Sequence, residues 1–152
     1  MIYSSYKNLK PSREPDFLIG PNKDDPYMRR WWLIPRNTEF NIYYHEVLHD
    51  DDDRALHDHP WPSISLCTKG RMAEVLPSGE SRVVKEGDVV FRPPTDAHRL
   101  ELIHGEPCET LFITGPRIRE WGFHCPKGFV EWTDFVDPNN PGSPGRGCGE
   151  MS

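Results

Sequence analysis

Two short stretches decide the fold prediction: HDHP at residues 57–60, and PPTDAH at residues 93–98, which follows Gly87. Side chains alternate between the two faces of a β-strand, so His57 and His59 should point in the same direction. His98 comes from a separate strand behind a turn. Three imidazoles that converge from two strands can hold a divalent metal and leave part of its coordination sphere open. This arrangement is typical of catalytic rather than structural metal sites.

The size and charge of the chain narrow the class of protein. Its 152 residues fit one domain with a substantial core. A net charge of -6 argues against binding to nucleic acid, since such proteins usually carry a basic face. No apolar run approaches the ~20 residues of a membrane span, and no apolar segment marks a signal peptide. We therefore expect a cytoplasmic protein with no nucleic-acid or membrane partner.

The four cysteines show no C-x-x-C pair and no framework spacing. They are Cys67, Cys108, Cys125 and Cys148. This pattern predicts reduced thiols, which suits the cytoplasm.

Short strands dominate the middle of the chain. Between residues 29 and 115 no segment has ten or more residues of helical periodicity, and Gly and Pro turns recur. The predicted strands are 29–34, 39–48, two within 63–76 broken at Lys69-Gly70, 81–85, 89–91, 99–103 and 110–114. In the second of these, Tyr43, His45 and Val47 share one face. Regularly spaced short strands predict an all-β sandwich or barrel.

The ends of the chain differ from the middle in composition. Residues 1–28 have no sustained period and are predicted to form an N-terminal arm or strap on the body. Residues 29–136 should form the barrel, with a helical turn at 131–135. Residues 137–152 consist mostly of Pro, Gly, Asn and Ser and have few apolar side chains to bury. This composition predicts a flexible, disordered tail.

The histidine motifs resemble those of the cupin superfamily. The first cupin motif is His-x-His followed by Glu and Gly, and this chain has His57, His59 and Gly70. The second is Gly, a gap and Pro-x-Gly-x-x-His, which Gly87 and residues 93–98 match in spacing. The resemblance covers roughly residues 40–115 and implies a single-domain double-stranded β-helix, or jelly-roll barrel. The stretches RALHDHPW (54–61) and REWGFHCP (119–126) are similar to small metal-binding cupins of bacteria and phages.

The chain departs from the cupin motifs at three positions. The motif glutamate should fall near Ser63 or Ile64, Thr95 replaces a glycine, and Leu102 lies near the usual asparagine. The predicted protein ligands are therefore His57, His59 and His98. This set resembles that of thiol dioxygenases, which hold Fe(II) with three histidines. Their Ser-x-His-x-Tyr group has no counterpart here, so that subfamily does not transfer.

These motifs predict a mononuclear metal-dependent enzyme that acts on a small polar molecule. Fe(II) is the expected divalent metal, with Mn, Ni or Zn as alternatives, and a dioxygenase is favoured over an isomerase or a hydrolase. The alternative is a non-catalytic module that binds a sugar, a nucleotide or an effector, because fold does not fix function. A third interpretation, a phage-capsid or modification accessory protein, comes only from the resemblance to phage cupins.

Five further side chains are candidates for lining the pocket. They are His45, Ser63, Ser65, Cys67 and Leu100. For His45 the alternative is simple packing, and for Cys67 it is a small buried core thiol, since Pro60 and Pro62 interrupt the strand parity.

Charged residues near the motifs have competing interpretations. Asp58 should support a ligand or anchor the loop, and residues 50–53 should form a solvated loop. Arg92, Arg99 and Arg117 could each hold a substrate carboxylate or phosphate, but individually they are predicted surface or salt-bridge residues.

Two segments outside the motifs have structural predictions. Residues 124–126 are predicted to form a structural clasp. The aromatic strand 29–34 is a candidate for forming a homodimer, either by exchange between two copies of the chain or by pairing at a sheet edge.

Overall fold

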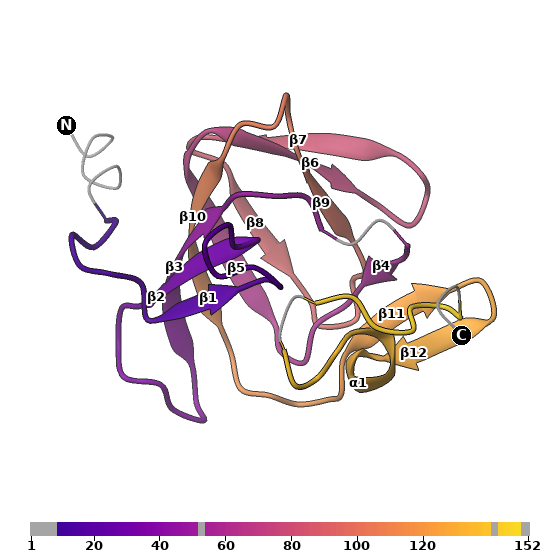
Figure 1. The fold of residues 1–152 in the computed structure, drawn as a ribbon. Coiled ribbons are helices and arrows are strands. Elements are labelled where there is room, and N and C mark those ends of the chain that lie inside the picture. The colour runs from indigo at the N-terminus through magenta and orange to yellow at the C-terminus, as the bar shows by residue number, and fades with distance from the viewer. Residues whose placement is uncertain (1–8, 52–53, 141–142, 150–152) are drawn as a thin grey trace.

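The computed structural model describes residues 9–51, 54–140 and 143–149, and these form an almost purely antiparallel β-structure. The strands are β1 (Phe17–Ile19), β2 (Met28–Trp32), β3 (Asn41–Val47), β4 (Leu56–His57), β5 (Ser63–Lys69), β6 (Arg71–Val75), β7 (Ser81–Lys85), β8 (Val89–Arg92), β9 (Arg99–Leu102), β10 (Cys108–Thr114), β11 (Gly122–Cys125) and β12 (Gly128–Glu131). One short helix, α1 (Trp132–Phe135), follows β12 (Figure 1).

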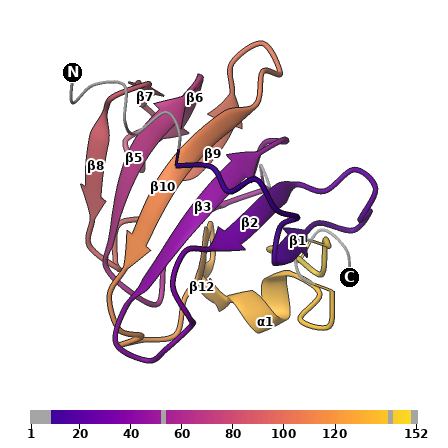
Figure 2. The same cartoon turned by 90° about the vertical axis from the view of Figure 1, so that its left-hand side faces the viewer.

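Three sheets make up the barrel. The largest has the order β1-β2-β3-β10-β5-β8, and these strands lie side by side in Figure 2. The other two have the orders β7-β6-β9 and β12-β11-β4. In the described part of the chain, neighbouring strands are non-consecutive at five places, which is the crossover pattern of a double-stranded β-helix: β3-β10, β10-β5, β5-β8, β11-β4 and β6-β9. The predicted all-β jelly-roll fold is confirmed.

An apolar cluster closes one end of the barrel. Val47, Cys67, Met72, Val84 and Cys108 are each at most 4% exposed and pack together. They come from β3, β5, β6, β7 and β10, so the cluster packs the two larger sheets against each other. Burial of apolar surface stabilises the fold by about 25 cal/mol for each Å² removed from water. Leu100 and Leu102 of β9 pack against it.

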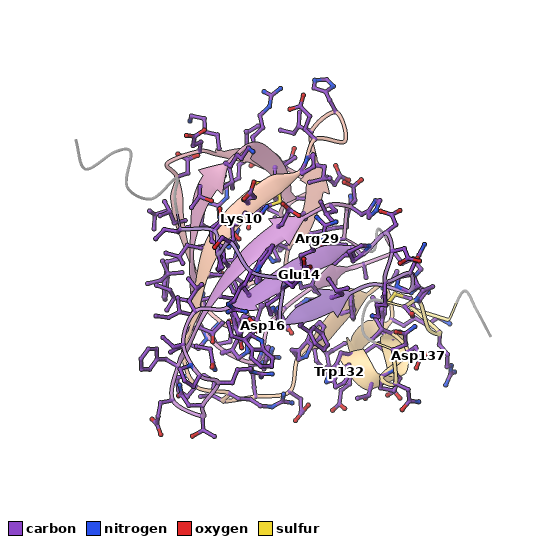
Figure 3. All side chains as sticks on the ribbon, turned by 60° about the vertical axis from the view of Figure 1, so that its left-hand side comes forward. Lys10, Glu14, Asp16, Arg29, Trp132 and Asp137 are labelled. Atoms are coloured by element: carbon purple, nitrogen blue, oxygen red, sulfur yellow. A yellow bond between two sulfur atoms is a disulfide. The ribbon has the colours of Figure 1, made fainter. Side chains whose placement is uncertain are left out.

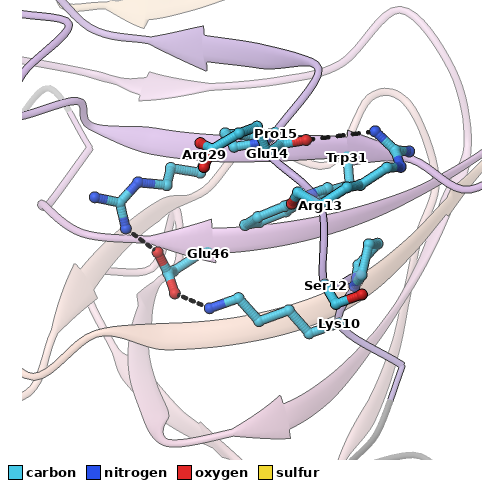
Figure 4. Close-up of a pocket in the computed structure, with 9 residues that line it drawn as sticks. Lys10, Ser12, Arg13, Glu14, Pro15, Arg29, Trp31 and Glu46 are labelled. Carbon is cyan, nitrogen blue, oxygen red and sulfur yellow. Dashed lines mark hydrogen bonds and ion pairs between the residues drawn. The ribbon is translucent and has the colours of Figure 1, made fainter.

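The N-terminal arm covers the outer face of the large sheet. Its β1 pairs with β2 and extends the sheet by one strand, which its composition did not predict. On the outer face Trp31 donates a hydrogen bond to the carbonyl of Arg13, and Lys10 and Arg29 both bond to Glu46. Figure 3 shows Lys10 and Arg29 over this face, and Figure 4 shows the two cations approaching Glu46 from opposite sides.

The predicted role of residues 29–34 at a sheet edge is wrong. Strand β2 lies between β3 and β1, which pairs with residues 28–30, and the Trp32 amide and carbonyl bond to the side chains of Asp16 and Arg13, so β2 is an inner strand of the sheet. Among the described residues, β1 and β8 are the outer strands of this sheet. The homodimer itself remains a prediction.

The described part of the tail contacts the body of the protein, while the predicted disorder of residues 137–152 stays a prediction. The Gly147 amide bonds to the Phe135 carbonyl, and residues 136 and 144 form a β-bridge. A disulfide joins Cys125 of β11 to Cys148. A covalent link and backbone hydrogen bonds stabilise a segment whose side chains bury little. Residues 141–142 and 150–152 lie outside the described part.

The disulfide also corrects the prediction of reduced thiols. Cys125 and Cys148 are oxidised, whereas Cys67 and Cys108 are free and fully buried. The cytoplasmic location predicted from reduced thiols therefore remains only a prediction. Among the described residues, no helix has the length and apolar character to cross a membrane.

Candidate metal centre

Backbone pairing places the three histidines together. His57 ends β4, and its backbone exchanges two hydrogen bonds of 2.9 Å with His98, which directly precedes β9. His59 lies in the following loop, where its amide bonds to the Pro94 carbonyl. Both histidine motifs are thus connected through the backbone as well as through their side chains.

The imidazole rings of His57, His59 and His98 converge. Each ring offers a nitrogen that lies within 4.8 Å of the nitrogens of the other two. The ring centroids are 5.1 Å apart for His57 and His59, 4.8 Å for His57 and His98, and 5.0 Å for His59 and His98. Metal–nitrogen bonds are about 2 Å long, so small side-chain rotations would bring the three atoms to a shared ion.

Burial keeps the imidazoles of His57 and His59 neutral. Burial lowers the pKa of His57 to about 4, against a partial upward effect of Asp51. Burial, with the neighbouring His57 and His98 rings, holds the pKa of His59 well below its usual value. A neutral imidazole has the free lone pair that a metal needs. His57 and His59 are also partly exposed, so the centre is accessible to solvent.

Glu74 forms a hydrogen bond with Nδ1 of His98. Its Oε2 lies 2.6 Å from Nδ1 of His98, so this nitrogen carries the proton and Nε2 is free for a metal. Arg92 and Arg82 also bond to the Glu74 carboxylate. Burial raises the pKa of Glu74, but the bonds from His98 and Arg92 outweigh it and lower that pKa to about 2. Glu74 is therefore an ionised hydrogen-bond acceptor.

Sequence reasoning missed Glu74, because the cupin motif places a glutamate near residue 63 rather than on β6. The available signal was alternation on that strand. Met72 and Glu74 share one face and are 3% and 1% exposed, whereas Arg71 is exposed. An acidic side chain on the buried face of a strand requires a partner.

Asp58 anchors the loop that carries the ligands. It is 1% exposed and accepts hydrogen bonds from the Gly122 amide and from His124, each at 2.9 Å, and forms a salt bridge with Arg119. Its own amide donates to the Gly122 carbonyl. Residues 119–125 thereby fix the chain between His57 and His59, which agrees with the predicted anchor and clasp.

Asp51 is not part of a simple solvated loop, as residues 50–53 were predicted to be. It accepts hydrogen bonds from Tyr27 and from the Leu100 amide, and its Oδ2 lies 3.9 Å from Nδ1 of His57. Asp50 accepts from the Leu102 amide. Residues 52–53 lie outside the described part.

The predicted pocket-lining residues divide into two groups. His45, Ser63 and Ser65 lie on one face of β3 and β5, in register with inward residues of β10, and all three are buried. Cys67 and Leu100 belong to the apolar cluster, where the sulfurs of Cys67 and Cys108 are 3.6 Å apart. The predicted arginines form ion pairs: Arg92 with Glu74, Arg99 with Glu101 and Arg117 with Glu120.

Aromatic rings connect the centre to the large sheet. The His59 ring stacks on Trp61 at 5.2 Å, Trp61 contacts Phe112 at 5.4 Å, and Phe112 contacts His45 at 5.1 Å. These contacts give the inner surface beside the histidines an apolar wall.

The residues fit a divalent transition metal. Three neutral imidazoles suit Fe, Ni, Cu or Zn. Among the described residues, Nδ1 of His59 is buried and has no hydrogen-bond partner. A buried nitrogen without a partner is costly, and coordination is one way to satisfy it.

Comparisons with known proteins place this geometry in context. A family model described as the AraC-like ligand binding domain matches residues 39–117. No curated protein matches the chain. Among solved structures, the DMSP lyase DddQ from Ruegeria pomeroyi DSS-3 is similar at 17% identity and a TM-score of 0.53, with 68% of this chain and 54% of the lyase chain covered. This chain thus spans about half the length of the lyase chain.

Two more solved structures share the fold. The polyketide cyclase RemF from Streptomyces resistomycificus has 23% identity and a TM-score of 0.52, over 68% of this chain and 69% of that chain. An uncharacterised double-stranded β-helix protein from Klebsiella pneumoniae has 16% identity and a TM-score of 0.52, over 70% of this chain and 90% of that chain. At these identities the likeness shows the fold alone.

Proposed function

Because this chain belongs to the family of AraC-like ligand-binding domains, a cupin-type family, we propose that it is a metal-dependent cupin enzyme for a small polar molecule. The observation that carries the proposal is the convergence of His57, His59 and His98, of which the first two are partly exposed. A divalent ion bound there would supply a Lewis acid and, in the case of iron, electrons for dioxygen.

The chain's own residues would prepare that site. Glu74 holds the proton of His98 on Nδ1 and directs Nε2 toward the centre. Asp58 fixes the backbone between the other two ligands through Gly122. Trp61 and Phe112 form an apolar wall that limits water near the reacting group. Three neutral ligands leave the positive charge of the ion uncompensated, which favours an anionic or polar substrate.

Dioxygenation is the reaction we propose first, with Fe(II) as the metal and Mn, Ni or Zn as alternatives. A three-histidine set leaves open positions for both a substrate and dioxygen. Isomerisation and hydrolysis are the alternative reactions on the same centre.

Metal analysis of protein purified without a tag tests the metal centre. We expect about one equivalent of a transition metal in the wild-type protein and loss of most of it in His57→Ala and in His98→Ala. His49→Ala is the matched control, since His49 is half exposed and bonds to Asp25 away from the centre. Full metal occupancy in both ligand variants would remove the basis of the proposal.

A non-catalytic ligand-binding module is the second candidate. The match of residues 39–117 to a family described by ligand binding supports it. The two candidates differ in turnover. An enzyme should consume oxygen or convert a member of a small-molecule panel only when loaded with metal. A binding module should show thermal stabilisation by a ligand with no turnover.

A further inference from the structure

Arg30 is a cation on the inner face of the large sheet. It lies opposite His45 in the β2–β3 register. Its Nε donates a hydrogen bond of 2.9 Å to Nε2 of His45, and its guanidinium carbon lies 4.6 Å from the ring centroid of Tyr43. Among the described residues, no carboxylate forms an ion pair with Arg30, and its two Nη groups make no hydrogen bond.

The neighbouring Arg29 has a carboxylate counter-ion, whereas Arg30 has none among the described residues. Arg29 points to the outer face of the same strand and forms an ion pair with Glu46 (Figure 4). Arg30 points inward, where burial lowers its pKa. A cation that is partly removed from water is stabilised by a counter-ion, and proteins usually supply one. The free Nη groups therefore indicate a place for an anion that is not part of the chain.

Contacts connect Arg30 to the metal centre on two sides. On one side, His45 leads through Phe112 and Trp61 to His59. On the other side, Tyr27 lies three residues before Arg30 in the chain. Tyr27 bonds to Asp51, which lies beside His57. Arg30 and the three histidines therefore face the same part of the barrel interior.

The side chains that surround Arg30 and the histidines are not all fully buried. Arg30, Trp61, Phe112, His57 and His59 all keep partial exposure. The apolar cluster borders this part of the inner face: Cys67 lies in the same cross-strand row as Arg30 and His45, Val47 and Cys108 lie in the next row, and all three are at most 3% exposed. A small molecule could thus reach Arg30 and the histidines from the same side.

We propose that the free Nη groups of Arg30 bind the carboxylate of a small substrate whose other end lies at His57, His59 and His98. The planar guanidinium group of Arg30 can donate two parallel hydrogen bonds to a carboxylate. The hydrogen bond from its Nε to His45 fixes the orientation of the group. His45 is a positioning residue, since its Nε2 accepts the Nε proton. The position of the reacting end depends on the proposed metal function, whereas binding of the carboxylate does not.

Titration of the metal-free protein with propionate, and with its uncharged analogue propionamide, tests the site. Binding would be followed by nuclear magnetic resonance of the backbone amides. We expect propionate to bind at millimolar concentrations and to shift amides near Arg30, and propionamide to bind at least about tenfold more weakly. In Arg30→Gln the affinity for propionate should fall at least about tenfold, and in Arg29→Gln it should stay unchanged.

Two further measurements cover failure of the glutamine variant to fold. Arg30→Lys keeps the positive charge but loses the planar guanidinium group. This variant should bind propionate several-fold more weakly than the wild-type protein. In the wild-type protein, propionate should protect Arg30, but not Arg29, from modification by phenylglyoxal. Unchanged propionate affinity in Arg30→Gln, equal binding of propionamide, or no protection of Arg30 would overturn the proposal.

A metal-ligand variant separates this proposal from the metal function. His57→Ala should lose metal but retain propionate binding. If the wild-type protein bound no metal but Arg30 still bound propionate, the metal function would fail and the carboxylate site would stand. If the wild-type protein bound metal but no propionate, the carboxylate site would fail and the metal function would stand.

Discussion

Glu74 and His98 form a buried pair in which a carboxylate oxygen lies 2.6 Å from the histidine Nδ1. Both residues are at most 4% exposed, and they lie on adjacent parts of β6 and the segment before β9. A carboxylate behind a ligating imidazole fixes the ring orientation and makes the opposite nitrogen more basic. Glu74 thus lies beside a candidate ligand and is not itself one of the three candidate ligands.

Glu74→Gln should weaken metal binding while all three imidazoles remain. We expect the affinity to fall about 10–100-fold, because an amide no longer holds the His98 proton with a charge-assisted bond. The free energy of unfolding should also fall by about 3 kcal/mol, since Arg92 is left buried without its counter-ion. Titration calorimetry with Zn²⁺ or Co²⁺ and chemical denaturation measure the two effects.

Glu80→Gln is the control for that experiment, because Glu80 is exposed in the β6–β7 turn. It should change neither quantity measurably. Wild-type metal affinity in Glu74→Gln would mean that Glu74 has only a structural role beside Arg92.

Gly122→Ala should disturb the loop between His57 and His59. A Cβ at this position would lie 2.2 Å from the Val130 carbonyl oxygen and 2.9 Å from the Glu131 Cα, both on the paired strand β12. Moving β11 to relieve this clash would displace the amide and carbonyl that bind Asp58. We expect a loss of about 1–3 kcal/mol in the free energy of unfolding, with weaker metal binding.

Thermal denaturation and a metal titration on the same sample measure this effect. A stable Gly122→Ala variant with unchanged metal affinity would show that the ligand loop does not depend on β11.

The ion pairs of Glu46 should appear in the pH dependence of stability. Burial raises the pKa of Glu46, but hydrogen bonds from Lys10 and Arg29 outweigh it, so this pKa lies below its ordinary value. A carboxyl with a lowered folded-state pKa stabilises the protein above its unfolded pKa. That stability is lost as the pH falls through the folded-state pKa. Between about pH 5 and pH 3 the wild-type protein should therefore lose more stability than Glu46→Gln.

Chemical denaturation at several pH values measures the difference between the two proteins. At neutral pH, Glu46→Gln should be less stable by about 1 kcal/mol, because β3 loses its ion pairs with Lys10 of the arm and with Arg29 of β2. Parallel pH profiles would contradict the assigned role of Glu46.

The sequence predicts the barrel well because its strands alternate locally. The predicted segments 81–85 and 110–114 coincide with or lie within β7 and β10, and the cupin resemblance is confirmed by the family match. The missed features depend on contacts distant in sequence. Strand β1 forms only by pairing with β2, and β4 is too short, at two residues, to show an alternating pattern. The disulfide joins two residues that are 23 positions apart in the sequence.

The same distinction holds at the candidate centre. The spacing of the motifs predicts that His57, His59 and His98 belong together. It does not reveal Glu74 or Arg30, because each takes its role from a partner on another strand. Arg30 and Arg29 are adjacent in the sequence, and only the register of β2 against β3 decides which of them faces inward.

Cys125→Ser should destabilise the protein by removing the link between β11 and Cys148. The disulfide closes a loop over a separation of 23 residues, and we expect a loss of about 2–4 kcal/mol in the free energy of unfolding. A dithiol reductant should lower the melting temperature of the wild-type protein and leave that of Cys125→Ser unchanged. In the folded protein only Cys125 and Cys148 should become available for alkylation on reduction, since Cys67 and Cys108 are 0% exposed. Alkylation of the wild-type protein at Cys125 without a reductant would show that the bond does not form, and contact between the described tail and the body would then depend on backbone hydrogen bonds alone.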